Sequence, residues 1–285
     1  MEKRLLGRTG EQLSVVGFGG ILVMNEEPQA ASRLVAQAVD RGINYFDVAP
    51  SYGNAEERLG PALEPYRKRV FLACKTEMRT RDGAAAALRQ SLQRLRTDHF
   101  DLYQFHGVSK MGEVEQILGP GGAMEAFLEA KDKGLIRFIG FSAHSEEAAL
   151  ALMDRFPFDS ILFPFNWVCW HQGQFGPRVL EKAMQKGVGR LALKALAKRT
   201  WKDDAERSKW PKCWYHPVES AEEAAMGLRF TLSRPITAAT SPGHAELFWW
   251  ACDAADKFTP LTQAEEAEIM KKSEGLTPIF PHSSD

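Results

Sequence analysis

Val70-Phe-Leu-Ala-Cys-Lys75 is a short apolar run that ends in a charged residue, and two neighbouring runs have a similar form. Tyr45-Phe-Asp-Val-Ala49 lies upstream and Phe100-Asp-Leu-Tyr-Gln-Phe-His106 lies downstream, with helical patterns between the runs. Short buried runs separated by helical segments are typical of βαβ units, in which neighbouring strands are parallel. The stretch 45–106 therefore predicts a parallel sheet with helices packed on it.

The same alternation continues along most of the 285-residue chain. Eight strand-like runs are found, at residues 15–19, 44–48, 70–74, 100–105, 136–141, 159–163, 188–193 and 235–239. Eight β/α units in a chain of this length predict an α/β fold, the closed (β/α)8 TIM barrel. We reject a doubly wound open sheet because Gly17-Phe-Gly19-Gly20-Ile-Leu22 lacks the third glycine of the dinucleotide-binding turn.

We expect a single domain over residues 1–285, because no linker or internal repeat interrupts the pattern. Residues 1–12, with Gly7 and Gly10, predict an N-terminal hairpin that closes the barrel bottom, and residues 278–285 predict an irregular tail. The connection after the seventh strand, residues 194–219, is far longer than the roughly 2 to 6 residues that are usual. Its basic and aromatic residues predict either a cover that closes over an anionic ligand or a solvated surface insertion.

The composition is that of an ordinary soluble globular protein, with 44% hydrophobic and 26% charged residues. A net charge of −1 provides no global field that would attract nucleic acid or a membrane surface. No segment approaches the roughly 20 apolar residues of a membrane helix. The four scattered cysteines indicate reduced thiols and a cytoplasmic location. We therefore expect a small-molecule substrate, no nucleic acid and no membrane; the sequence identifies no protein partner.

Two short motifs contain the residue types of a metal site. They are Cys169-Trp-His171 and Cys213-Trp-Tyr-His216. Their spacing differs from that of zinc sites, and their aromatic neighbours suit packing, so we expect no metal.

Four residues whose side chains suit catalysis lie at or just beyond the ends of strand-like runs: Asp47, Tyr52, Lys75 and His106. The carboxyl ends of the strands of a parallel barrel meet at one mouth, so we expect these side chains to converge. A tyrosine with its ordinary pKa near 10 is a poor acid at neutral pH. We expect the Lys75 ammonium to lower the pKa of Tyr52 and so make its proton available for catalysis.

These residues belong to stretches in which the chain resembles the aldo-keto reductases, over nearly its whole length. The matching stretches are Val16-Gly-Phe-Gly-Gly20, Gly42-Ile-Asn-Tyr-Phe-Asp-Val-Ala-Pro-Ser-Tyr-Gly53, Ala73-Cys-Lys75, Asp101-Leu-Tyr-Gln-Phe-His106, Gly134-Leu-Ile-Arg-Phe-Ile-Gly-Phe-Ser142 and Ser241-Pro-Gly243. Members of this family are (β/α)8 barrels that reduce carbonyls or oxidise alcohols with NADPH or NADH. The resemblance implies that Tyr52 is the general acid and base, that Lys75 tunes it, that Asp47 holds Lys75 and that His106 orients the substrate.

The resemblance also implies a nicotinamide cofactor, NADP(H) with NAD(H) as the alternative. Ser142 stands where the family grips the carboxamide, but Ala143 and Leu162 replace the usual Asn and Gln and cannot bond an amide. No basic residue for a 2′-phosphate is evident between His244 and Trp250. The residues that we assign to the cofactor are Gly19, Gly20, Ser142, Asn166, Leu193, Lys194, Ser241, Gly243 and His244.

The leading hypothesis is an NAD(P)H-dependent oxidoreductase that interconverts a carbonyl and an alcohol. The candidate carbonyls are aldehydes and ketones, including sugar-derived ones. Two alternatives stay open. The incomplete carboxamide grip motivates a cofactor-independent isomerase or lyase that uses the same four residues. The third hypothesis is a non-catalytic subunit that senses nucleotide, although such a subunit has little need of a tuned tyrosine.

Overall fold

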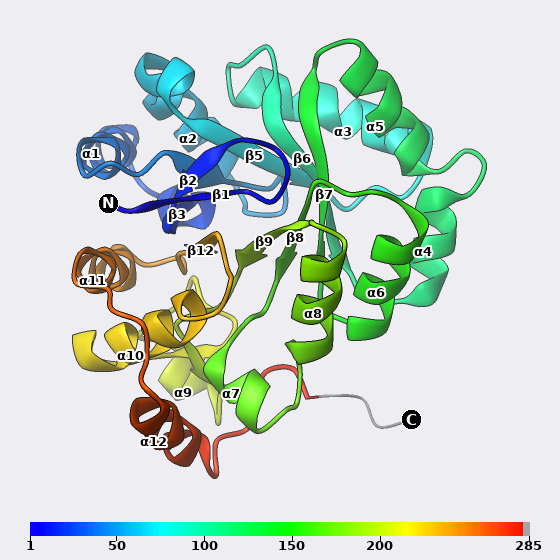
Figure 1. The fold of residues 1–285 in the computed structure, drawn as a ribbon. Coiled ribbons are helices and arrows are strands. Elements are labelled where there is room, and N and C mark those ends of the chain that lie inside the picture. The colour runs from blue at the N-terminus through cyan, green and yellow to red at the C-terminus, as the bar shows by residue number, and fades with distance from the viewer. Residues whose placement is uncertain (282–285) are drawn as a thin grey trace.

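The computed structural model describes residues 1–281 and shows a closed barrel of eight parallel strands, surrounded by helices (Figure 1). The predicted (β/α)8 fold is therefore confirmed. Around the barrel the strands follow the order β12-β3-β4-β5-β6-β7-β8-β9. Their bounds are β3 (Val16–Gly19), β4 (Tyr45–Asp47), β5 (Phe71–Thr76), β6 (Phe100–Val108), β7 (Ile136–Ala143), β8 (Ser160–Phe163), β9 (Gly189–Ala192) and β12 (Ala238–Thr240).

Twelve α-helices lie within the described residues, most of them in the connections between barrel strands. They are α1 (Pro28–Asp40), α2 (Ala55–Leu63), α3 (Arg81–Arg94), α4 (Met111–Leu118), α5 (Ala123–Asp132), α6 (Glu146–Arg155), α7 (Trp167–His171), α8 (Pro177–Gln185), α9 (Asp204–Arg207), α10 (Ala221–Leu232), α11 (Ala245–Asp256) and α12 (Gln263–Ser273). Two short 3-10 helices, η1 (Gly20–Val23) and η2 (Glu64–Arg69), complete the connections. None of these helices is both long and apolar enough to cross a membrane.

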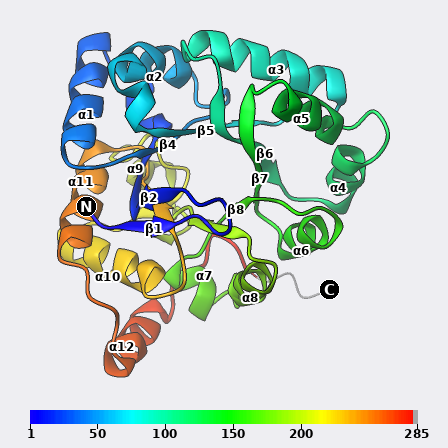
Figure 2. The ribbon, with the colours of Figure 1, turned by 45° about the horizontal axis from the view of Figure 1, so that its top comes forward.

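The N-terminal hairpin lies across one end of the barrel (Figure 2). Its strands are β1 (Lys3–Leu5) and β2 (Gln12–Ser14), so the hairpin extends two residues beyond the predicted limit at residue 12. Leu6 and Leu13 are fully buried against residues of the barrel interior. Gly7, at a φ of +52°, allows the tight approach, because a Cβ there would lie 2.4 Å from the backbone nitrogen of Gly189. The hairpin thus closes the end of the barrel at which the strands begin.

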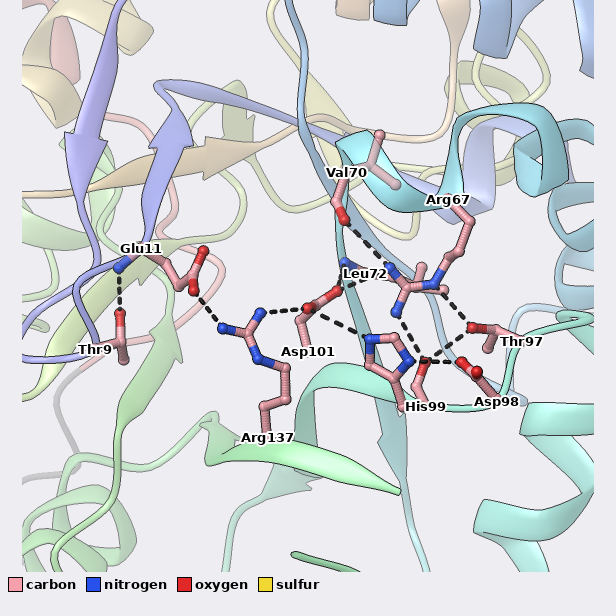
Figure 3. A network of polar contacts seen from close by, with 10 residues as sticks. All are labelled: Thr9, Glu11, Arg67, Val70, Leu72, Thr97, Asp98, His99, Asp101 and Arg137. Carbon is pink, nitrogen blue, oxygen red and sulfur yellow. Dashed lines mark hydrogen bonds and ion pairs between the residues drawn. The ribbon is translucent and has the colours of Figure 1, made fainter. Parts of the chain in front are cut away.

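A polar network ties this hairpin to the barrel (Figure 3). The Asp101 carboxylate accepts hydrogen bonds from Leu72 N at 2.9 Å, from Arg67 at 3.0 Å and from Arg137 at 2.7 Å. Arg137 also pairs with Glu11 of the hairpin. The network borders an open groove of about 900 Å³. This groove is larger than the cavity at the opposite end, but its buried charges are already paired, so we assign it a structural role.

Side-chain alternation along the strands separates two packed layers. Tyr45 faces the barrel interior, whereas Phe46 packs outward against Phe18 at a ring-centroid distance of 5.0 Å. Between the barrel and the helices, Phe105 stacks on Phe127 of α5 at 4.0 Å. Cys74 lies in this outer layer, as expected from its position beside Lys75. Packing on both faces holds the strand ends rigidly in place.

The long connection after β9 contains structure that the sequence did not predict. β10 (Ala197–Arg199) and β11 (His216–Pro217) form an antiparallel pair with α9 between them. Several basic side chains of the connection are paired with carboxylates, such as Arg199 with Glu206 and Lys198 with Glu223. Its later part lies over the barrel mouth, where Lys212 and Trp214 line the cavity. The later part thus lies where a cover would lie, whereas the paired charges of the earlier part fit a solvated insertion, so both interpretations stay open.

The chain after α12 is irregular as far as it is described. Residues 276–281 contain no helix or strand, and the remaining part of the predicted tail 278–285, residues 282–285, lies outside the described residues. Phe280 packs on His144 at a ring-centroid distance of 4.9 Å, which brings the tail to the rim of the mouth.

Candidate active site

The four residues singled out in the sequence line one cavity at the mouth of the barrel. Asp47 is the last residue of β4, Lys75 lies near the end of β5 and His106 lies in β6. Tyr52 lies in the turn between β4 and α2. The cavity has a volume of about 160 Å³, and its other lining residues are Gly19, Ile21, Ser142, His144, Leu162, Leu193, Lys194, Lys212, Trp214, Tyr215, Thr240, Ser241, Pro242 and Gly243.

A buried ion pair forms the floor of the cavity. Lys75 Nζ donates to Asp47 Oδ1, and both side chains are at most 2% exposed. The second carboxylate oxygen, Oδ2, accepts hydrogen bonds from Gln104 Nε2 at 2.9 Å and from the Tyr45 hydroxyl at 3.3 Å. Burial would lower the pKa of Lys75, but attraction to Asp47 outweighs it and raises that pKa above its ordinary value. Lys75 is therefore a permanent cation at neutral pH.

Gln104 and Tyr45 are positioning residues that the sequence reasoning missed. Each lies two positions from a residue that was identified, Gln104 before His106 and Tyr45 before Asp47. Because side chains two apart on a strand face the same side, this spacing was an available signal. By holding Asp47 in one orientation, they hold Lys75 beneath Tyr52.

Tyr52 lies beside both Lys75 and His106. Lys75 Nζ is 5.3 Å from the centre of the Tyr52 ring, and the His106 ring meets that ring edge-on at 5.9 Å. The expectation of a lowered tyrosine pKa is wrong for the free protein. Burial raises the pKa of Tyr52 more than Lys75 lowers it, and Asp47 adds to the increase. Tyr52 is therefore protonated at neutral pH, which is the state that a proton donor needs.

His106 is neutral at physiological pH. Burial lowers the pKa of its imidazole to about 3, and the nearby Lys75, Lys194 and Arg79 act in the same direction. Its Nδ1 atom lies 3.4 Å from Ser51 Oγ and 3.6 Å from Glu77 Oε1, which fixes the plane of the ring. A neutral imidazole offers one donor and one acceptor and can orient a bound oxygen without adding charge.

Six of the nine residues assigned to a cofactor line this cavity, and three do not. Gly19, Ser142, Leu193, Lys194, Ser241 and Gly243 are lining residues. Gly20 lies beneath the surface, where a Cβ would meet Val48 at 2.7 Å. His244 Nε2 accepts a hydrogen bond from Lys212 N at 3.1 Å.

The structure does not bring Asn166 into the cavity. Its amide nitrogen donates to the carbonyls of Lys194 and Ala197 at 2.9 and 2.7 Å. Its amide oxygen caps α7 by accepting from Val168 N and Cys169 N. Because both side-chain atoms are engaged inside the protein, Asn166 does not replace a missing carboxamide partner.

The residues around the cavity fit a nicotinamide ring better than they fit a whole dinucleotide. Ser142 Oγ accepts from Gly107 N at 2.8 Å, which leaves its own proton free for a carboxamide oxygen. Leu162 and Leu193 offer apolar surface to a ring. Ligand pockets usually measure roughly 300 to 1,000 Å³, whereas this cavity measures about 160 Å³. Lys212 also packs closely on Gly243, because a Cβ added to Gly243 would lie 2.7 Å from Lys212 Cβ. The phosphates of a dinucleotide therefore require the segment 210–215 to move.

Lys194 and His144 form a second polar pair at the rim. Lys194 Nζ lies 3.1 Å from His144 Nε2. It also lies 5.0 Å from the centre of the Trp214 ring and 5.2 Å from the centre of the Phe280 ring. Burial lowers the pKa of Lys194 to about 7 and that of His144 to about 2. The pair lies on the same cavity as the tetrad Asp47, Tyr52, Lys75 and His106.

The cysteine motifs lie in packed surroundings. Cys169 and Cys213 are buried free thiols, and burial raises their pKa values to about 11 and about 12. Within residues 1–281, no group of three or more His, Cys, Asp and Glu side chains is arranged to hold a metal ion.

Known proteins resemble this chain over most of its length. A family model described as "Aldo/keto reductase family" matches residues 15–237. The oxidoreductase YqkF of Bacillus subtilis is 32% identical over 180 residues, which cover 58% of this chain and 56% of the relative. L-galactose dehydrogenase of Arabidopsis thaliana is 29% identical over 216 residues, covering 69% and 66% respectively. The chain thus spans little more than half the length of the Bacillus subtilis relative in this alignment.

A comparison of structures covers more of the chain. The holo form of the aldo-keto reductase AKR11C1 from Bacillus halodurans superposes with a TM-score of 0.75 and 22% identity, over 98% of both chains. At this identity the similarity establishes the fold. The range matched by the family model, residues 15–237, includes Asp47, Tyr52, Lys75 and His106.

Proposed function

The chain belongs to the aldo/keto reductase family, and on this basis we propose that it is an NAD(P)H-dependent oxidoreductase that interconverts a carbonyl and an alcohol. The observation that supports this proposal most strongly is the placement of Tyr52 beside the Lys75–Asp47 pair at the barrel mouth. Donors fixed in advance near one point are what a developing alkoxide requires.

The proposed roles follow from the contacts of each residue. Tyr52 donates its proton to the carbonyl oxygen during reduction and takes it back during oxidation. Lys75 stabilises the tyrosinate that remains, while Asp47, held by Gln104 and Tyr45, keeps Lys75 in place. The neutral His106 orients the substrate oxygen. When bound, the nicotinamide supplies or accepts the hydride, and Ser142, Leu193, Ser241 and Gly243 are the residues that would hold it.

We propose NADP(H) as the cofactor, with NAD(H) as the alternative, and a cytoplasmic location. The four cysteines are buried and unpaired, which suits a reducing compartment. The names of two relatives, L-galactose dehydrogenase and 6-dehydroglucose reductase, concern sugar-derived substrates and support the inclusion of such compounds in a first substrate panel.

Titration with NADPH and NADH, followed by nucleotide fluorescence, tests this proposal together with assays on a panel of aldehydes and ketones. We expect saturable binding of at least one nucleotide and carbonyl-dependent oxidation of it. Binding without turnover on any carbonyl or alcohol would favour a nucleotide-sensing subunit instead.

A cofactor-independent isomerase or lyase remains the second candidate. It is favoured by the cavity volume of about 160 Å³ and by the apolar Ala143 and Leu162 at positions where a carboxamide needs polar partners. Under this alternative neither nucleotide binds, and the protein converts a hydroxycarbonyl compound without consuming NADPH or NADH. Proton NMR of such a mixture without nucleotide distinguishes the two candidates.

The segment 210–215 lies beside Gly243, where the phosphates of a nucleotide would bind, and its anchor leads to a kinetic prediction. Lys212 Nζ anchors the segment 210–215 by donating to Glu26 at 2.7 Å and to the Leu22 carbonyl at 3.0 Å. Glu26→Gln removes the ionic part of this anchor, so we expect nucleotide association to become about two- to fivefold faster, as for loss of a weak exposed ion pair. Stopped-flow fluorescence measures the rate.

The matched control for this prediction is Glu27→Gln, which removes the same charge from the exposed neighbouring residue. An equal change in both variants would mean that net charge, rather than the Lys212 anchor, controls nucleotide entry.

A further inference from the structure

We propose that Lys194 anchors a carboxylate on the carbonyl substrate, so that the preferred substrates are oxo acids, including acidic sugar derivatives. This inference rests on the proposed function of the same cavity. Lys194 lies two residues after the end of β9 and has a φ of +64°, a region that residues other than glycine enter rarely. An uncommon backbone conformation that directs a lysine into a candidate active site is a reason to look for a functional role.

The hydrogen-bonding capacity of Lys194 is only partly used. A charged ammonium can only donate, so Lys194 Nζ donates one proton to His144 Nε2 at 3.1 Å. The rings of Trp214 and Phe280 lie about 5 Å from it and accept no strong hydrogen bond. Two N–H donors therefore remain for a ligand, which matches the two oxygens of a carboxylate.

The charges around the cavity are balanced except at this residue. Lys75 is neutralised by Asp47, and Lys212 by Glu26. Among residues 1–281, no carboxylate lies within ion-pair distance of Lys194, so the cavity has one cation without an anionic partner. A partly buried cation is costly unless a ligand provides the opposite charge. The carboxylate of a substrate would provide it.

Burial makes this cation sensitive to pH. It lowers the pKa of Lys194 to about 7, and repulsion from Lys75 acts in the same direction. A bound carboxylate favours the charged form and therefore raises this pKa. Carboxylate binding should be strongest below pH 7 and should weaken as the pH rises through the pKa of the free protein, because the lysine must then gain a proton to bind.

The groups around Lys194 whose pKa values are shifted have moved away from the range from pH 6 to 9. The pKa values of His106 and His144 are lowered to about 3 and about 2, so both rings stay neutral. Burial raises the pKa values of Tyr52, Tyr215 and Cys169, and attraction to Asp47 raises that of Lys75. Lys212 faces the cavity as part of its pair with Glu26. A pH effect in this range therefore reports Lys194.

The first test compares 4-formylbenzoate with its neutral methyl ester as substrates. We expect Lys194→Met to lower the ratio of the two kcat/KM values by about ten- to a hundredfold, as for loss of hydrogen bonds to a charged group. Lys194→Arg should retain much of the preference, which keeps the test informative if the methionine variant folds poorly. Lys202→Met is the matched control, because it removes a charge from an exposed position of the same connection. An unchanged ratio in Lys194→Met overturns the inference.

The second test does not require turnover. Isothermal titration calorimetry with 4-formylbenzoate and no nucleotide should give a dissociation constant that rises by up to about tenfold per pH unit above pH 7. This dependence should disappear in Lys194→Met. If binding and its pH dependence are found but no carbonyl is turned over, the proposed function fails while the anion site stands. If Lys194→Met weakens NADPH binding and leaves 4-formylbenzoate binding unchanged, Lys194 serves the nucleotide and the inference is wrong.

Discussion

Tyr52→Phe is expected to lower kcat for carbonyl reduction by about 10²- to 10⁴-fold, the usual contribution of a positioned general acid. The substitution removes one hydroxyl and preserves the ring that packs beside Lys75 and His106. Because the hydroxyl donates its proton only as the alkoxide forms, the loss should appear in kcat while nucleotide affinity stays nearly unchanged. Steady-state kinetics combined with a fluorescence titration of nucleotide measures both quantities.

Tyr66→Phe is the matched control for this variant, since Tyr66 lies in η2, away from the barrel mouth. Its kinetics should equal those of the unmodified protein. Retention of most activity in Tyr52→Phe would mean that another group supplies the proton, and the proposed mechanism would be wrong.

Lys75→Met is expected to destabilise the protein by about 3 to 5 kcal/mol, because it leaves the Asp47 carboxylate buried without its cation. Both side chains are at most 2% exposed, so water cannot replace the lost partner. The pKa of Lys75 is raised above its ordinary value, so its contribution is fully present at neutral pH and is lost only as the pH rises through the folded-state pKa. Urea unfolding at neutral pH measures the change.

The double variant Lys75→Met/Asp47→Leu separates the cost of an unpaired charge from the loss of attraction. We expect it to recover much of the lost stability, since replacing a buried ion pair by apolar residues is often neutral. Activity should remain absent in both variants because Tyr52 has lost its neighbouring cation. A single variant as stable as the unmodified protein would show that the buried pair contributes little.

Much of the barrel could be predicted because apolar residues recur with different periods in strands and in helices. The pattern of residues 45–106 implied parallel strands, and the structure confirms their carboxyl ends as neighbours in the barrel. Elements with weak apolar stripes were missed. In α12 only Ile269 and Ser273 are buried, so its sequence shows no strong helical face. The β10–β11 pair depends on residues that are distant in sequence, which local patterns do not report.

The site was predictable where it depended on strand ends and less so where it depended on burial. Asp47, Tyr52, Lys75 and His106 line one cavity, as their positions had implied. The predicted direction of the Tyr52 pKa shift was wrong because desolvation exceeds the effect of Lys75. The extent of desolvation depends on the folded surroundings, which the local sequence does not specify. Asn166 is engaged as a helix cap of α7, a contact set by the chain around it.

The pairing of Lys194 with His144 could not be predicted, because the two residues follow different strands and meet across the mouth. Nothing in either local sequence specifies that distance. The same holds for Lys212, whose anchor on Glu26 joins residues 186 positions apart.

The most direct test of the proposed chemistry is to follow deuterium from nucleotide deuterated at C4 of the nicotinamide into the alcohol product by NMR and mass spectrometry. We predict that one deuterium is found on the carbinol carbon and that none enters from solvent D₂O at that position. Product labelled there from solvent, or product formed without any nucleotide, would contradict a reductase mechanism at this cavity.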